Sequence, residues 1–113
     1  KPLTVYGNGS QTRSYCYIED LVRGIECVMN SRLNQPINLG NPNEMSVLLL
    51  AKKIRKLTGS KSKIVHRPLP QDDPKQRCPD ISLAKKELGW GPQMALDGGL
   101  IKTIEYFKTK IQR

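Results

Sequence analysis

Hydrophobic spacing changes twice near the start of the chain. "LTVY" at 3–6 combines β-branched and aromatic residues, which is typical of a short strand, and the turn-forming "GNGS" follows it. "TRSYCYI" at 12–18 then alternates well enough to predict a second extended segment. From Ile18 to Met29 apolar residues recur at helical spacing, with acidic residues in the first turn where the helix dipole favours negative charge. We therefore expect two extended segments followed by an amphipathic helix.

The middle of the chain continues this alternation. "PINLG" at 36–40 reads as a short strand that stops at a glycine, and "SKIVHR" at 62–67 as another. Between them, Ser46 can cap a helix that ends at Gly59. The expected buried stripe of this helix is Val47, Leu50, Ala51, Ile54 and Leu57.

Two further helices are expected near the end. Asp80 or Ser82 can cap a short helix that closes at Gly89, with Trp90 packing onto its end. A last helix from about 97 to 110 has an apolar face. That face consists of Leu100, Ile104, Phe107 and Ile111. Short strands alternating with about four helices predict an α/β fold.

Composition places limits on this picture. At 113 residues, with 37% hydrophobic and 26% charged residues, the chain fits one soluble globular domain at most. No apolar run approaches the roughly 20 residues of a membrane span, and no signal-peptide pattern is present, so we expect a non-secreted protein without membrane contact. Cys16, Cys27 and Cys78 are odd in number and lack metal-ligand spacing, which predicts free, buried or half-buried thiols, no metal site and a cytoplasmic location.

The net charge of +9 is unevenly distributed. Residues 1–44 balance to zero, whereas residues 45–113 hold 15 basic and 6 acidic residues. Such an excess favours an anionic partner, either nucleic acid, an acidic surface or a phosphorylated small molecule, although a solvated lysine-rich surface explains it equally well. Nucleic-acid binding is disfavoured, because only Tyr106 and Phe107 lie among the C-terminal lysines and Phe107 is expected to face the core.

Three further patterns in the sequence could carry binding or catalytic chemistry. "VYGNGSQTR" combines a glycine loop with Arg13, but it lacks GxGxxG spacing and no helix follows at once, so an ordinary turn stays open beside a phosphate loop. Tyr106 and Lys110 form a YxxxK pair, which we interpret as coincidence on a lysine-rich helix. Asp72 and Asp73 read as turn residues before a proline rather than as paired catalytic carboxylates.

Arg77 stands out in "QDDPKQRCPD" at 71–80. Pro79 restricts Cys78 to extended geometry, so Arg77 is presented from a stiff loop. Such a cation suits an anionic ligand. An ion pair with a neighbouring aspartate is the alternative, and the spacing alone leaves both open.

Four segments together resemble a known family. They are "PLTVYGNGSQTRSYCYIEDLVRGI", "PINLGNP", "QDDPKQRCPDISLAKKELGW" and "GLIKTIEYFK". In order and spacing they resemble the C-terminal part of UDP-glucuronate decarboxylases, which belong to the extended short-chain dehydrogenase/reductase family of nucleotide-sugar enzymes with a Rossmann-type fold. The resemblance implies that residues 1–113 are the nucleotide-sugar-binding region, with the NAD-binding part and the catalytic YxxxK upstream of Lys1. It assigns no catalytic residue to this chain.

The resemblance also implies an activity. NAD oxidises the 4-hydroxyl of UDP-glucuronate, the β-keto acid loses carbon dioxide, and NADH reduces the ketone to give UDP-xylose. Related 4,6-dehydratases and 4-epimerases share this scaffold, and the loop at 71–80 favours the decarboxylase. Family members are commonly homodimers, but their dimer helices lie upstream of Lys1, which leaves the oligomeric state open.

The resemblance further implies a substrate site. Tyr6 matches the position beside the nucleotide base, Arg13 an arginine that reaches the charged middle of the ligand, and Arg77 the arginine on the diphosphate. Gln11 and Tyr17 are implied neighbours. The order Lys75, Gln76, Arg77 departs trivially from the commoner pattern of the family, and Cys78 replaces a usual basic residue.

Overall fold

The chain folds into two compact units, each assembled from two stretches of sequence. The computed structural model describes residues 1–72 and 74–111. The first unit, here called the sheet unit, contains Lys1–Arg13 and Glu44–Arg77, and the second, the helix unit, contains Ser14–Asn43 and Cys78–Arg113. Each unit therefore depends on residues far apart in the sequence.

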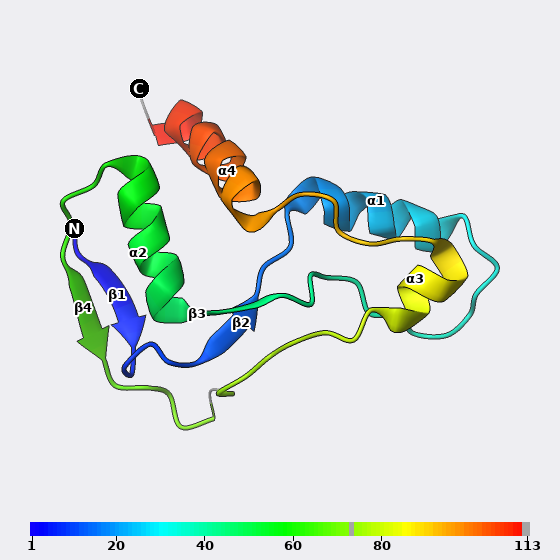
Figure 1. Ribbon diagram of the computed structural model, residues 1–113, viewed down its shortest axis with the longest axis horizontal. Helices are drawn as coiled ribbons and strands as arrows, with labels where there is room; N and C mark the ends of the chain where they lie inside the picture. Colours follow the sequence, from blue (N-terminus) through cyan, green and yellow to red (C-terminus); the bar gives the residue numbers. More distant parts are fainter. Residues whose placement is uncertain (73, 112–113) are drawn as a thin grey trace. The chain divides into compact units, whose positions relative to one another are not determined.

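Two parallel strands form the centre of the sheet unit. β1 (Leu3–Tyr6) pairs with β4 (Ile64–Arg67) in the register Leu3 to Ile64 and Tyr6 to Arg67, and both lie in segments predicted to be strands. Parallel strands need a crossover connection, and here the crossover includes α2 (Val47–Thr58), which contacts β1 (Figure 1). Val5 of β1 is 1% exposed, so the centre of this unit lies between strand and helix.

The ends of α2 are where the sequence predicts them. Ser46 Oγ accepts the Leu49 N–H at 3.1 Å, and Gly59 ends the helix with a left-handed φ of 66°. The apolar stripe of this helix was expected to be buried, but no residue of α2 is fully buried. Leu57, one member of the stripe, is exposed. A two-stranded sheet gives one helix too little surface to cover a whole face.

A short second sheet joins β2 (Thr12–Ser14) and β3 (Glu44–Ser46). The extended segment expected at 12–18 is thus a strand over its first three residues only. Glu44 begins β3, and the Thr12 hydroxyl donates to its carboxylate at 3.1 Å.

Three helices make up most of the helix unit: α1 (Ile18–Met29), α3 (Ser82–Leu88) and α4 (Leu96–Ile111). The Asp80 carboxylate accepts the Ser82 N–H at 3.0 Å, and this hydrogen bond lowers the pKa of Asp80. The N-cap position itself is occupied by Ile81, whose side chain makes no capping hydrogen bond, so neither of the two predicted cap residues stands there. Trp90 follows the end of α3 and is 1% exposed, as expected, in a buried cluster with Ile81 and Ala84.

The strand predicted at 36–40 is wrong. These residues form no strand, and the side chains of Ile37 and Leu39 instead pack against the Trp90 cluster. An apolar run signals burial, whereas a strand also needs a hydrogen-bonded neighbour. Burial here is achieved through side chains alone.

The apolar stripes of two helices are less covered than expected. Phe107 of α4 is 54% exposed, which corrects the expectation that it faces the core. On α1 the fully buried residues are Asp20 and Gly24, while no residue of the apolar stripe is fully buried and most are exposed. All three cysteines are free, with Cys16 and Cys27 half-buried but Cys78 exposed, contrary to expectation. Within the described residues, no helix is long and apolar enough to cross a membrane.

Candidate functional site

The glycine loop between β1 and β2 is held against the first turn of α2. The carbonyls of Gly9 and Gln11 accept the N–H groups of Leu48 and Val47, both at 3.0 Å. Gly9 has a φ of 79°, and a Cβ there would lie 2.6 Å from Cβ of Leu48. The glycine is required for this approach, and the loop leads into a strand rather than a helix. These contacts favour the ordinary-turn interpretation over a phosphate loop.

Gln11 closes this loop from inside. Its side chain is 7% exposed, and Nε2 donates to the Tyr6 carbonyl at 2.9 Å. The amide therefore fixes the path of the chain between β1 and β2. Tyr6 itself ends β1 with about half of its surface exposed, so its ring is accessible to a ligand.

A backbone bridge joins the segment after Gln11 to the loop at 71–80. Thr12 pairs in parallel with Gln76: the Thr12 N–H donates to the Lys75 carbonyl at 2.8 Å, and the Arg77 N–H donates to the Thr12 carbonyl at 3.3 Å. Side chains alternate between the two faces of extended backbone. The residues just before and just after Thr12 therefore point to the same face as the residues just before and just after Gln76. The bridge thus brings Arg13 and Arg77 together, and it sets Lys75 beside Gln11 on the same face.

Arg13 is also anchored at this bridge. Its Nη1 donates to the Thr12 carbonyl at 2.7 Å, the same oxygen that accepts the Arg77 N–H. The two arginines are therefore attached to one carbonyl, one through its guanidinium and the other through its backbone. Of the two aspartates in this loop, Asp72 lies in a turn and Asp73 falls outside the described residues.

A hollow of about 510 Å³ adjoins this bridge through Gln11 and Lys75, although none of Tyr6, Arg13 and Arg77 lines it. This volume falls within the roughly 300–1,000 Å³ of small-molecule sites. Four of its five lining residues have polar side chains, and one of these is a cation: they are Asn8, Ser10, Gln11, Leu69 and Lys75. Sequence reasoning missed Asn8, Ser10 and Lys75, and only the register of the Thr12–Gln76 bridge could have identified Lys75.

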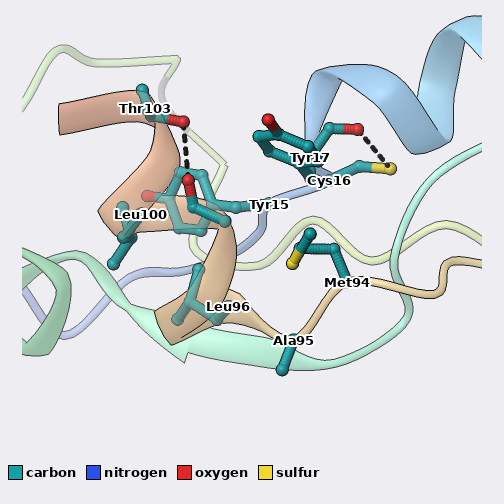
Figure 2. A pocket seen from close by; sticks show the side chains of 9 residues that line it. Tyr15, Cys16, Tyr17, Met94, Ala95, Leu96, Leu100 and Thr103 are labelled. Carbon is teal, nitrogen blue, oxygen red and sulfur yellow. Dashed lines mark hydrogen bonds between the residues drawn. The ribbon is translucent and has the colours of Figure 1, made fainter. Parts of the chain in front are cut away.

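Tyr17 belongs to the helix unit, so the sheet unit holds four of the five predicted site residues. Tyr17 precedes α1 and lines a separate hollow of about 70 Å³ together with Tyr15, Met94 and Thr103 (Figure 2). A Cβ added at Gly99 would lie 3.3 Å from the Tyr17 ring, so the ring packs closely on α4. This space holds about two water molecules and is too small for a nucleotide sugar.

The YxxxK pair lies on the surface of α4. Lys110 Nζ is 5.5 Å from the ring centroid of Tyr106, and that ring meets Phe107 edge-on at 5.3 Å. Tyr106 is 57% exposed. A proton-abstracting phenol needs a substrate held against it, and the pair instead has the geometry of an exposed cation–π contact, in keeping with coincidence.

The family model for GDP-mannose 4,6-dehydratase matches residues 1–103. The chain belongs to this GDP-mannose 4,6-dehydratase family. Curated members of related sequence include UDP-glucuronic acid decarboxylase 1 of Danio rerio, 50% identical over 110 residues, which covers 97% of this chain and 26% of that protein. UDP-glucuronic acid decarboxylase 4 of Arabidopsis thaliana is 44% identical, with 98% and 25% covered. The chain thus spans about a quarter of the length of these relatives.

The fold of this member of the GDP-mannose 4,6-dehydratase family is similar to part of several solved nucleotide-sugar enzymes. UDP-glucose 4-epimerase of Thermotoga maritima, solved with UDP-glucose, has a TM-score of 0.93 at 30% identity, covering 99% of this chain and 36% of that one. UDP-glucuronic acid 4-epimerase of Bacillus cereus, solved with UDP-glucuronic acid and NAD, has a TM-score of 0.88 at 32% identity, with 97% and 36% covered. The predicted α/β fold, as a part of a Rossmann-type extended dehydrogenase/reductase, is confirmed.

Proposed function

We propose that residues 1–113 form the nucleotide-sugar-binding part of a UDP-glucuronate decarboxylase that makes UDP-xylose. The observation that carries this proposal is the Thr12–Gln76 bridge, which assembles Arg13 and Arg77 from distant segments beside a hollow of suitable size. The 50% identity to UDP-glucuronic acid decarboxylase 1 supports the choice of substrate.

In this proposal the two arginines hold the diphosphate of the ligand. A guanidinium presents paired donors that match phosphate oxygens, and a charge-assisted hydrogen bond contributes about 1.5–3 kcal/mol. Tyr6 offers its exposed ring to the base, and Gln11 keeps the loop in shape for both. Tyr17 stays a predicted neighbour of the ligand. Lys75, the one cation in the lining of the hollow, adds its positive charge to those of the two arginines.

The residues present do not fit NAD. Dinucleotide binding requires a glycine-rich turn that opens a helix, so that free N–H groups face the pyrophosphate, whereas the loop after β1 enters a strand and offers carbonyls to α2. NAD, the proposed cofactor, is therefore assigned to residues outside this chain. What residues 1–113 contribute is positioning, because binding energy from the UDP half can hold the sugar in reactive geometry.

Replacing Arg77 tests this proposal. In the full-length enzyme, Arg77→Ala should weaken UDP binding by about ten- to a hundredfold, since one charge-assisted contact is lost. Arg32→Ala, at an exposed arginine in the helix unit, is the matched control and should leave affinity unchanged. Calorimetric titration with UDP measures both, with circular dichroism as the check on folding. Unchanged affinity for a folded Arg77→Ala protein would remove Arg77 from the site.

A 4-epimerase is the second candidate, because the solved structures named above are 4-epimerases. The two activities give different products from UDP-glucuronate. A decarboxylase releases carbon dioxide and UDP-xylose, whereas an epimerase returns the 4-epimer with its carboxylate intact. Chromatography of the products formed by the full-length enzyme distinguishes them, and retention of all carboxylate would contradict the decarboxylase. The related 4,6-dehydratases remain a further alternative, and they too would release no carbon dioxide.

A further inference from the structure

A basic groove lies between α2 and β4 of the sheet unit. It measures about 470 Å³. Its lining consists of Leu48, Lys52, Arg55, Lys63, Ile64 and His66, and includes no acidic residue. We propose that this groove binds a small, multiply charged phosphate compound, at a site separate from that of the nucleotide sugar.

The local charge around the groove is unusually one-sided. Residues 45–71 contain seven lysines and arginines and no aspartate or glutamate. Among the described residues, no ion pair involves Lys52, Arg55 or Lys63. Unneutralised charges of one sign around a concave surface raise the local concentration of counter-ions. The groove is therefore a place where an anion is expected to collect.

Helix stability accounts for only part of this charge. Arg55 lies in the last turn of α2, where a cation complements the helix dipole. Lys52 lies mid-helix and Lys63 precedes β4, so neither position benefits in this way. The helix α2 and the segment just before the next element, β4, thus each contribute a cation to one groove without gaining helix stability from it.

His66 adds a group whose tautomer is fixed by the fold. Its Nδ1 lies 2.7 Å from the Gly7 carbonyl, and a carbonyl only accepts, so Nδ1 carries the proton. The second ring nitrogen, Nε2, is then left for a ligand.

The shape and lining favour a small phosphate over a macromolecule. The volume lies within the roughly 300–1,000 Å³ of small-molecule sites. Half-buried Leu48 and Ile64 can accept the apolar part of an organic phosphate, while exposed Lys52 and Lys63 meet its charged groups as mobile point charges. Single-stranded nucleic acid would require aromatic rings for stacking, and among the lining residues only His66 has a ring.

The test is a titration of the purified protein with inorganic tripolyphosphate at near-physiological salt, followed by NMR. We expect saturable shifts of the His66 ring and of the Lys63 and Ile64 amides. The double variant Lys52→Gln, Lys63→Gln should weaken binding by about tenfold or more, because two charge-assisted contacts are lost. The same variant should leave UDP affinity unchanged, so this result does not depend on the proposed function.

A matched control removes equal charge elsewhere. Lys102→Gln with Lys108→Gln changes two exposed lysines of α4 and should leave tripolyphosphate binding intact. If both double variants weaken tripolyphosphate binding equally, the binding reflects general electrostatic attraction to the protein, and the proposal is overturned. Shifts that do not saturate at His66 would also overturn it. If an acidic peptide of equal charge displaces tripolyphosphate, the groove binds an acidic protein rather than a small phosphate compound, which would also overturn the proposal.

Discussion

The two faces of α1 differ in how far they are buried. The face that carries Asp20 and Gly24 is buried, with Asp20 only 5% exposed, although it is the more polar side of the helix. Four residues of the apolar stripe are exposed, from 44% at Val22 to 76% at Met29, while Leu21 and Val28 are half-buried. Helical periodicity thus reveals which residues share a face, but it does not reveal which face the rest of the chain covers.

The buried face of α1 is stabilised by complementary hydrogen bonds around Trp90. The Asp20 backbone carbonyl accepts Trp90 Nε1 at 3.0 Å, and the Asp20 carboxylate accepts the Met94 N–H at 2.9 Å. Arg23 donates to the Gly91 carbonyl at 2.7 Å and lies 3.4 Å from the same carboxylate. At Gly24 a Cβ would lie 2.9 Å from the indole, so the glycine makes room for the ring.

Removing the Trp90 indole from the buried face should lower the stability more than any other change. Trp90→Ala is expected to lower the free energy of unfolding by about 3–5 kcal/mol, because it leaves a cavity and removes the hydrogen bond to Asp20. Denaturant titration measures this change. Met29→Ala, on the open face, is the control and should change stability by less than about 0.5 kcal/mol. Similar losses for both variants would show that the two faces are equally packed in solution.

Asp20 should show the next largest effect, with a dependence on pH. Burial alone would raise the pKa of Asp20, but hydrogen bonds from the backbone of Met94 and Gln93 and the nearby Arg23 outweigh it, so the pKa lies below its usual value. A lowered folded-state pKa stabilises the protein above the unfolded value of about 3.9, and this contribution is lost as pH falls through the folded pKa. Asp20→Asn removes the charge while keeping one acceptor oxygen.

We expect Asp20→Asn to cost about 1–3 kcal/mol at neutral pH, with the difference from the unmodified protein shrinking below about pH 4. Denaturant titrations at several pH values measure both the cost and its pH dependence. Glu19→Gln, at the exposed neighbour, is the matched control and should show neither. A cost that stays constant with pH would contradict a role for the ionised carboxylate.

The smallest effect is expected on the open stripe. Val22→Gln with Ile25→Gln should change the free energy of unfolding of residues 1–113 by less than about 0.5 kcal/mol, since both side chains are already 44% and 47% exposed. Thermal unfolding followed by circular dichroism is sufficient. A loss above about 1 kcal/mol would mean that another surface covers the stripe in solution.

Local signals predicted most of the secondary structure. Local sequence determines the cap at Ser46, the glycines that end α2 and α3, and the helical period of α1. Each depends on residues within a few positions of each other, so each could be predicted from the sequence. The segment at 36–40 and the exposure of Phe107 depend on what lies alongside in space, and there the predictions failed.

The candidate site shows the same division. Arg13 and Arg77 could be chosen individually from the sequence and its resemblance to a family. Their meeting depends on a backbone bridge between Thr12 and Gln76, a non-local pairing that no local pattern encodes. For the same reason Lys75, which seemed a trivial rearrangement, is found lining the hollow.

The exposure of Cys78 has a practical consequence for spectroscopy. This thiol lies next to Arg77, whereas Cys16 and Cys27 are half-buried. Burial, followed by the charge of Asp20, raises the pKa of Cys16 and so reduces its reactive thiolate. A maleimide fluorophore should therefore attach first at Cys78, giving the unmodified chain a reporter one residue from the proposed diphosphate contact.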